Sequence, residues 1–287
     1  SKKLGKVLAG KNGIIGALKE ELIDTSLESE KDIAALRYTP SGAFGSCRFK
    51  LKSLSENKAE YQRLIDVFQA HNIGYFFYNG GGDSQDTANK VSQLSLQMGH
   101  PICCVGIPKT VDNDVYPISQ TLGAWTAAEQ GAVFFENIAN ENTTSQRQLI
   151  IHEVMGRNCG WLTAYTAKEY HERLNKKQFL PEILIEKNRW DIDAVYIPEI
   201  EIDFNNECAR LRKLMDEKDS INIFLSEGAG TDTIVKEMEK NGKTVTRDAF
   251  GHVDLDTINP GQWFAKQFAK ELNAHKTLVQ KSGYFGR

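Results

Sequence analysis

Residues 73–84 read IGYFFYNGGGDS, and this stretch decides the fold class. The run 73–78 is short, apolar and rich in aromatic residues, which is typical of a buried strand, and it ends in Asn79 and three glycines. Apolar residues at the spacing of one helix face stand on both sides of it. They are Tyr61, Leu64, Ile65 and Phe68 before the strand and Ala88, Val91, Leu94 and Met98 after it. The pattern predicts a helix, a strand, a glycine turn and a second helix.

The same alternation continues along the chain. Further strands are predicted over 101–107, 149–154, 194–197 and 221–225, and further helices over 125–138 and 231–240. Asn241-Gly242 is a common stop signal for the last of these helices. Alternating strands and helices predict an α/β fold with a mostly parallel sheet that is covered on both faces.

Composition excludes several classes of protein. The 287 residues are 40% hydrophobic and 25% charged, as in an ordinary globular protein, and the net charge is −3. We expect no nucleic-acid partner, because no basic stripe is visible. We expect no membrane span, because no apolar run reaches 18 residues, and no signal peptide, because no apolar core follows the basic start. Five cysteines without a CxxC pair predict reduced thiols and a cytoplasmic protein.

The glycine turn is the first candidate site. Gly80, Gly81 and Gly82 allow the backbone to approach an anion closely, and the helix that follows presents N–H groups at its start. A phosphate fits this arrangement. A plain turn with Asp83 or Ser84 as helix cap fits it equally well. The spacing matches neither the dinucleotide fingerprint nor the Walker loop.

The second candidate is the segment 106–114, GIPKTVDND, at the end of a predicted strand. A carboxylate such as Asp112 can act as general base toward a hydroxyl, and Lys109 can offset charge that develops on a phosphate. Asp and Asn are also ordinary turn residues, so a turn without function is the alternative.

Three more segments lie at strand ends or at the chain end. In HEVMGRNCGW (152–161), Arg157 can bind an anionic group, whereas His152 is interpreted as a hydrogen-bonded core histidine because Gly156 breaks the zinc motif HExxH. In LSEGAG (225–230), Glu227 can accept hydrogen bonds from sugar hydroxyls or cap a helix. The terminal GYFGR (283–287) indicates nothing by itself.

Together, and in this order, these segments resemble the phosphofructokinase family from about Gly10 to Arg287. The stretch 39–48, TPSGAFGSCR, is similar to the glycine-rich stretch of that family that ends in a donor-side arginine, here Arg48. The resemblance implies an α/β fold of two Rossmann-like lobes with mostly parallel sheets, flanking helices and an active site in the cleft between them. It implies a phosphoryl-donor lobe over 1–124, a fructose 6-phosphate lobe over 125–275 and a return toward the donor lobe over 276–287.

The resemblance also implies a reaction and its residues. Asp112 would take the proton of the 1-hydroxyl of fructose 6-phosphate, and Lys109 would neutralise charge with Mg²⁺. The donor-binding residues would be Gly81, Gly82, Asp83, Ser84 and Arg48. The residues that bind the sugar phosphate would be Thr110, Asp112, Met155, Gly156, Arg157, Glu227, Tyr284 and Arg287.

Two residues resemble the pyrophosphate-dependent branch of the family. ATP-using members typically carry glycine where this chain has Asp83 and Lys109. A carboxylate at position 83 would repel a nucleotide α-phosphate, and an ammonium at position 109 favours a small, dense polyanion. The expected reaction is the reversible, glycolytic formation of fructose 1,6-bisphosphate from pyrophosphate. The alternatives are an ATP-dependent 6-phosphofructokinase and a non-catalytic regulatory subunit.

The chain departs from the family pattern at Gly82, where an aspartate linked to magnesium is usual. Asp83, Asp114 or the pyrophosphate would then hold the ion. The first strand and first phosphate loop of the family are expected to precede Ser1, and family members continue beyond Arg287. A homo-oligomer, dimer or tetramer, is expected by the same resemblance.

Overall fold

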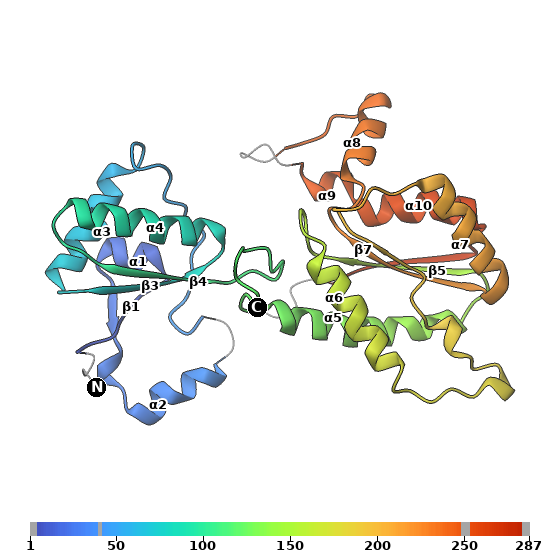
Figure 1. Ribbon diagram of the computed structural model, residues 1–287, viewed down its shortest axis with the longest axis horizontal. Helices are drawn as coiled ribbons and strands as arrows, with labels where there is room; N and C mark the ends of the chain where they lie inside the picture. The colour runs from blue at the N-terminus through green and yellow to red at the C-terminus, as the bar shows by residue number, and fades with distance from the viewer. Residues whose placement is uncertain (1–4, 40–41, 248–252, 283–287) are drawn as a thin grey trace. The chain divides into compact units, whose positions relative to one another are not determined.

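The computed structural model describes residues 5–39, 42–247 and 253–282, and they form two compact units that divide between Lys109 and Thr110. Figure 1 labels their elements. The first unit contains β1 (Leu8–Gly10), α1 (Ile14–Lys19), β2 (Leu22–Asp24), α2 (Glu30–Ala35), α3 (Lys58–Ala70), β3 (Tyr75–Gly80), α4 (Gly82–Gln97) and β4 (Cys103–Pro108). The second contains α5 (Ala124–Ile138), β5 (Gln148–Val154), α6 (Trp161–Leu174), β6 (Ala194–Tyr196), α7 (Phe204–Lys218), β7 (Ser220–Ser226), α8 (Thr231–Lys240), α9 (Leu255–Ile258), α10 (Pro260–Leu272) and β8 (Lys276–Ser282).

In the first unit, β3 and β4 pair in parallel, and β1 and β2 form a separate antiparallel pair. The inward residues of β3, Phe76 and Tyr78, pack with the apolar stripes of α3 and α4. The outward residues Tyr75 and Phe77 are each 62% exposed. The prediction of a fully buried strand is therefore wrong for this face, because α3 and α4 supply the core on the other one.

In the second unit, four parallel strands are ordered β6-β7-β5-β8. Helices α5 and α6 lie on one face of this sheet, and α7 and α10 lie on the other (Figure 1). Side chains of β5 alternate between the two cores: Leu149 and Ile151 join α7 and α10, whereas Ile150 and Val154 join α5 and α6. The predicted parallel sheet with two covered faces is confirmed here.

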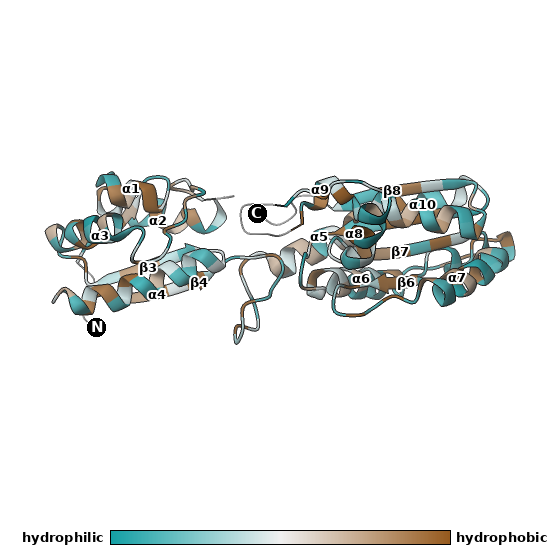
Figure 2. Ribbon diagram, turned by 90° about the horizontal axis from the view of Figure 1, so that it is seen from above, coloured by the Kyte–Doolittle hydropathy of each residue, from teal (hydrophilic) through white to brown (hydrophobic). Residues whose placement is uncertain are grey.

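The helices owe their positions to amphipathic patterning. Figure 2 shows hydrophilic and hydrophobic residues side by side along α4 and α7. α7 buries Leu211 and Met215, and the residues that α10 buries include Phe264 and Phe268; both pairs are four residues apart and so lie on one helix face. Among the described residues, none of the helices combines the length and apolar character that a membrane crossing needs.

The predicted elements are found with small shifts in their bounds, and the junction of the units falls at Lys109 and Thr110 rather than at 124 and 125. The segment 110–123 belongs with the second unit because Val111 packs against the core of α5 and α6. The strand β8 pairs with β5 in the second unit. The expected return toward the donor lobe over 276–287 is therefore not seen in 276–282, and 283–287 lie outside the described residues. The predicted roles of the two lobes stay predictions.

Candidate functional site

In the first unit, the glycine turn joins β3 directly to α4. The carbonyl oxygen of Gly80 accepts hydrogen bonds from Gln85 Nε2 at 2.9 Å and from the backbone N–H of Lys109 at 2.8 Å. This second bond ties the end of β4 to the turn. A Cβ on Gly80 would lie 2.1 Å from Ser84 Oγ, so packing itself requires glycine at this position.

Packing does not require glycine at the next two positions. A Cβ on Gly81 or Gly82 would meet no described atom within 4 Å, and Gly81 has an ordinary φ of −73°. Gly81 also precedes α4 without a side-chain cap. Backbone that is open in front of a helix N-terminus can receive an anion, which supports the phosphate interpretation of this turn.

An ion pair lies at this turn. Asp83 lies in the first turn of α4, and its Oδ1 is 2.8 Å from Lys50 Nζ. Arg48 is on the same chain segment as Lys50, two positions earlier, and the exposed Lys109 follows β4. Lys50 is a residue that the sequence analysis missed, since only its distance to Asp83 in the fold singles it out.

In the second unit, the loop with Thr110, Asp112 and Asp114 precedes α5. The backbone N–H of Asp112 donates to Thr110 Oγ1 at 3.2 Å. Asn113, which has a φ of 55°, accepts a hydrogen bond from the N–H of the buried Thr121 at 2.8 Å. These local hydrogen bonds give the loop a defined shape and hold Asp112 and Asp114 next to each other.

The ends of β5 and β7 are adjacent because the two strands pair in parallel, with Val154 opposite Ser226. Ser226 Oγ donates to the carbonyl of Gly156 at 2.6 Å, and the N–H of Gly156 donates to Glu227 Oε1 at 3.3 Å. Gly156 has a φ of 138°, where other residues are strained. The segments that contain Met155-Gly156-Arg157 and Glu227 are thus joined.

The carboxyl groups of this unit influence each other. Burial raises the pKa of Asp112 above its ordinary value, the charge of Asp114 raises it further, and Arg157 lowers it. Burial also raises the pKa of Glu227, and the hydrogen bond from the N–H of Gly156 lowers it. The charge of Asp112 raises this pKa further, and Arg157 lowers it. The fold therefore brings Asp112, Asp114, Arg157 and Glu227 within electrostatic range of one another.

Two more residues lie near this group. Glu199 Oε1 accepts a hydrogen bond from the N–H of Gly160, at the start of α6, at 2.8 Å. Burial raises the pKa of the Cys159 thiol, and the charges of Glu199, Asp114 and Asp112 raise it further. The sequence offers no signal for Glu199, because it follows β6 in a segment without a motif.

His152 lies in the core, as predicted, but the expectation that its ring nitrogens are hydrogen-bonded is wrong among the described residues. It is fully buried against the rings of Phe134, Phe135 and Phe224, and neither ring nitrogen has a hydrogen-bond partner among the described residues. The predicted sugar-phosphate residues Tyr284 and Arg287 lie outside the described residues.

The carboxylates offer few ligands for magnesium. Within the described ranges, no group of three His, Cys, Asp or Glu side chains could hold a metal ion. Mg²⁺ needs fewer protein ligands when substrate phosphates supply the rest, and one or two carboxylates are then sufficient. Asp114, whose charge acts on Asp112, fits this requirement. Asp83, 2.8 Å from Lys50, offers a second carboxylate.

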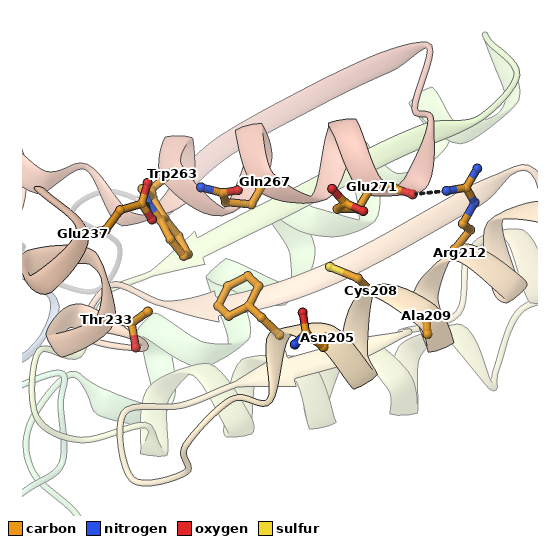
Figure 3. A pocket seen from close by; sticks show the side chains of 10 residues that line it. Asn205, Cys208, Ala209, Arg212, Thr233, Glu237, Trp263, Gln267 and Glu271 are labelled. Atoms are coloured by element: carbon orange, nitrogen blue, oxygen red, sulfur yellow. Dashed lines mark hydrogen bonds between the residues drawn. The ribbon is translucent and has the colours of Figure 1, made fainter. Parts of the chain in front are cut away.

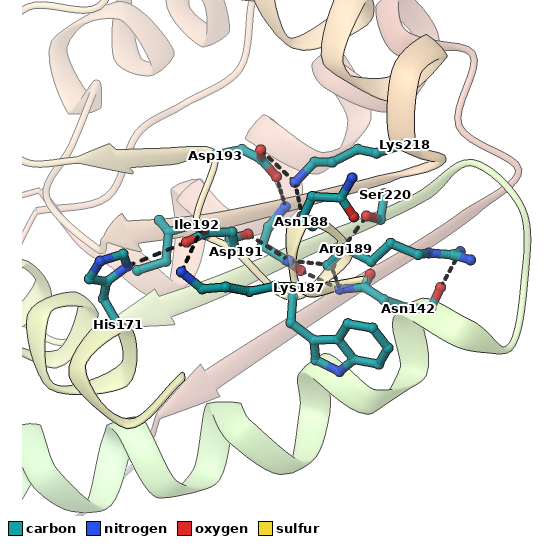
Figure 4. A network of polar contacts seen from close by, with 12 residues as sticks. Asn142, His171, Lys187, Asn188, Arg189, Asp191, Ile192, Asp193, Lys218 and Ser220 are labelled. Carbon is teal, nitrogen blue, oxygen red and sulfur yellow. Dashed lines mark hydrogen bonds and ion pairs between the residues drawn. The ribbon is translucent and has the colours of Figure 1, made fainter. Parts of the chain in front are cut away.

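Two hollows lie apart from all of these residues. A groove of about 550 Å³ runs between α7 and α10 and is lined by Phe204, Cys208, Trp263 and their neighbours (Figure 3). The second hollow lies beside the buried ion pair of Lys218 and Asp193, whose charged atoms are 2.8 Å apart. This ion pair connects the end of α7 to the segment before β6 (Figure 4). Neither hollow is lined by a predicted site residue.

The chain was compared with known proteins. Residues 1–259 match the family model described as phosphofructokinase. A pyrophosphate–fructose 6-phosphate 1-phosphotransferase of Methylomonas methanica is 42% identical over 98% of this chain and 71% of its own length. One of Mastigamoeba balamuthi is 50% identical over 96% of this chain and 70% of its own length.

A solved structure is similar as well. The crystal structure of a pyrophosphate-dependent phosphofructokinase from Nitrosospira multiformis superposes with a TM-score of 0.71 at 37% identity. The match covers 99% of this chain and 62% of that one, so the chain spans less than two thirds of its length. Family model, relatives and fold agree with the motif order of the five segments, and the chain belongs to the phosphofructokinase family.

Proposed function

We propose that this protein transfers a phosphoryl group from pyrophosphate to the 1-hydroxyl of fructose 6-phosphate, a reversible step of glycolysis. The observation that carries the proposal is the grouping of Asp112 with Arg157 and Glu227 at the ends of β5 and β7. Ligands of parallel α/β sheets bind at this edge. The relatives named above supply the identity of the two substrates.

Asp112 is the proposed general base. It accepts the proton of the 1-hydroxyl as the oxygen attacks the transferring phosphorus, while the bridging P–O bond of pyrophosphate breaks and inorganic phosphate leaves. Its raised pKa, caused first by burial, makes it a stronger base than an exposed aspartate. In phosphoryl transfer the protein takes little part in covalent chemistry. The position of this carboxylate therefore accounts for most of its contribution to the rate.

Arg157 and Glu227 are the proposed acceptor-side contacts, together with Thr110, Met155 and Gly156. The Arg157 guanidinium suits the phosphate of the sugar, and a carboxylate such as Glu227 accepts hydrogen bonds from sugar hydroxyls. Tyr284 and Arg287 are proposed as further contacts by the family resemblance. Cys159 and Glu199, beside the carboxylates, border the same region.

Gly81, Gly82, Asp83, Ser84 and Arg48 are the proposed donor-side residues. The open backbone of the two glycines supports this assignment. Lys109 places an ammonium after β4 and stabilises charge on the transferring group. Asp83 would lie against the α-phosphate of a nucleotide and repel it, which accounts for the use of pyrophosphate.

Magnesium fits this proposal. Asp114 or Asp83 would hold the ion jointly with pyrophosphate oxygens, and the bound ion would neutralise phosphate charge. We further propose a cytoplasmic homo-oligomer. The cytoplasm is supported by the free state of all five cysteines, Cys47, Cys103, Cys104, Cys159 and Cys208.

A coupled assay of fructose 1,6-bisphosphate formation with pyrophosphate or ATP tests the proposal. We expect turnover with pyrophosphate and little or none with ATP. Turnover with ATP alone would assign the ATP-dependent reaction instead. Binding of fructose 6-phosphate without turnover from either donor would assign a regulatory subunit.

A further inference from the structure

The segment that carries Lys50 is irregular but firmly held. Leu51 is 2% exposed and packs in the core of the first unit. On its C-terminal side, Lys52 donates its N–H to Asn57 Oδ1 at 2.9 Å and accepts a hydrogen bond from Tyr61 Oη at 3.1 Å. The backbone around Lys50 is therefore anchored, although it belongs to neither a helix nor a strand.

From this anchored position, Lys50 reaches the start of α4. Its Nζ lies 2.8 Å from Asp83 Oδ1, and the two side chains are 40% and 61% exposed. An ion pair with this exposure contributes little to the stability of a fold. The pair nonetheless lies next to Gly81 and Gly82, where packing against the described residues does not require glycine.

Asp83 would behave differently without this partner. It lies in the first turn of α4, and the N-cap residue Gly81 offers no side chain to the free N–H groups there. A carboxylate in the first turn is attracted by the helix dipole and can turn toward such N–H groups. Turned in this way, Asp83 would occupy the place at which a phosphate would bind.

We propose that Lys50 is a positioning residue for the donor site: its ammonium holds the Asp83 carboxylate away from the N-terminus of α4, which leaves that place to pyrophosphate. The inference rests on the proposed function and extends it to a residue outside the family motifs quoted above. Lys50 acts through Asp83 and not through contact with the donor. Its removal is therefore expected to weaken pyrophosphate use only while Asp83 keeps its charge.

The test is a double-mutant cycle with KM for pyrophosphate as readout. Lys50→Met is expected to raise this KM about tenfold, because pyrophosphate must then compete with the Asp83 carboxylate for the N–H groups at the start of α4, and to leave KM for fructose 6-phosphate within about twofold. Lys50→Arg is expected to restore the parent value within about threefold, because a guanidinium can hold the same carboxylate. In an Asp83→Asn background, Lys50→Met is expected to change KM by less than about twofold.

Lys52 provides the matched control. It is a lysine on the same segment, its side chain is 67% exposed, and its Nζ lies 3.9 Å from Glu56. Lys52→Met should leave both KM values unchanged, and all variants should melt within about 2 °C of the parent. Should Lys50→Met melt lower than this, Lys50→Gln repeats the cycle with a polar side chain.

Two results would overturn the inference. One is a parent-like KM for pyrophosphate in Lys50→Met, and the other is a tenfold effect that persists in the Asp83→Asn background. A parent protein without pyrophosphate-dependent turnover would contradict the proposed function instead. Calorimetric binding of magnesium pyrophosphate would then replace KM as the readout of the same cycle, so the two failures are distinguishable.

Discussion

At the scale of single residues, Asp112 carries the largest expected effect. Asp112→Asn keeps the size of the side chain and removes its basicity. We expect kcat to fall by about 10²–10⁴-fold, because the 1-hydroxyl loses its proton acceptor. Binding of fructose 6-phosphate, measured by calorimetry, should change little. Turnover within tenfold of the parent would remove Asp112 from the mechanism.

The neighbour Arg157 predicts a shift of the pH profile. The base must be ionised, so kcat falls as the pH is lowered through the raised pKa of Asp112. Arg157 lowers this pKa, so Arg157→Ala should move the acid limb of kcat to higher pH. Profiles of kcat at saturating substrate from pH 4 to 8 measure the shift. An acid limb that stays in place or moves to lower pH would contradict the assigned geometry.

At the scale of elements, the site depends on the turns that follow β5 and β7. A Cβ on Gly228 would lie 1.7 Å from the carbonyl oxygen of Arg157, so these two turns are in backbone contact. The strands bring the turns together, but glycine at position 228 determines how closely they approach.

Gly228→Ala should separate the two turns and displace Arg157. We expect affinity for fructose 6-phosphate to fall by roughly 1.5–3 kcal/mol, the range of one charge-assisted contact, with circular dichroism like that of the parent. Gly74→Ala is the matched control, since a Cβ there would meet no described atom within 4 Å. An unchanged dissociation constant for Gly228→Ala would show that this contact does not position Arg157.

At the scale of the whole molecule, the buried His152 makes the stability of the second unit depend on pH. Burial lowers its pKa from 6.5 to about 3. The unfolded chain therefore binds a proton between pH 6.5 and 3 that the folded chain rejects, and stability falls as the pH decreases through this window. The effect belongs to the whole unit, because the surrounding rings come from α5 and β7.

His152→Leu, a change of similar volume, should remove this sensitivity to acid. The free energy of unfolding in urea should decrease between pH 7 and pH 4.5 in both proteins. The decrease should be smaller in His152→Leu than in the parent, by up to several kcal/mol. His275→Leu, at an exposed histidine, should behave like the parent. An equal acid response in the parent and His152→Leu would mean that other groups control acid unfolding.

The fold class and the candidate site residues could be predicted from local patterns in the sequence. Short apolar runs and helical stripes are local signals, and glycines with charged residues at strand ends mark where ligands bind, so β3, β5 and β7 and the motif residues after them could be predicted. The sequence did not reveal that β3 leaves Tyr75 and Phe77 exposed, because burial depends on which elements cover a face.

Only the tertiary structure decided which charges meet. The pairing of Lys50 with Asp83, the hydrogen bond from Gly160 to Glu199 and the influence of Arg157 on Asp112 all join residues that are far apart in the chain. Coulombic interaction and desolvation depend on distance and burial in space, and neither quantity is encoded by spacing along the sequence. For this reason the sequence predicts candidate site residues but not the electrostatic interactions among them.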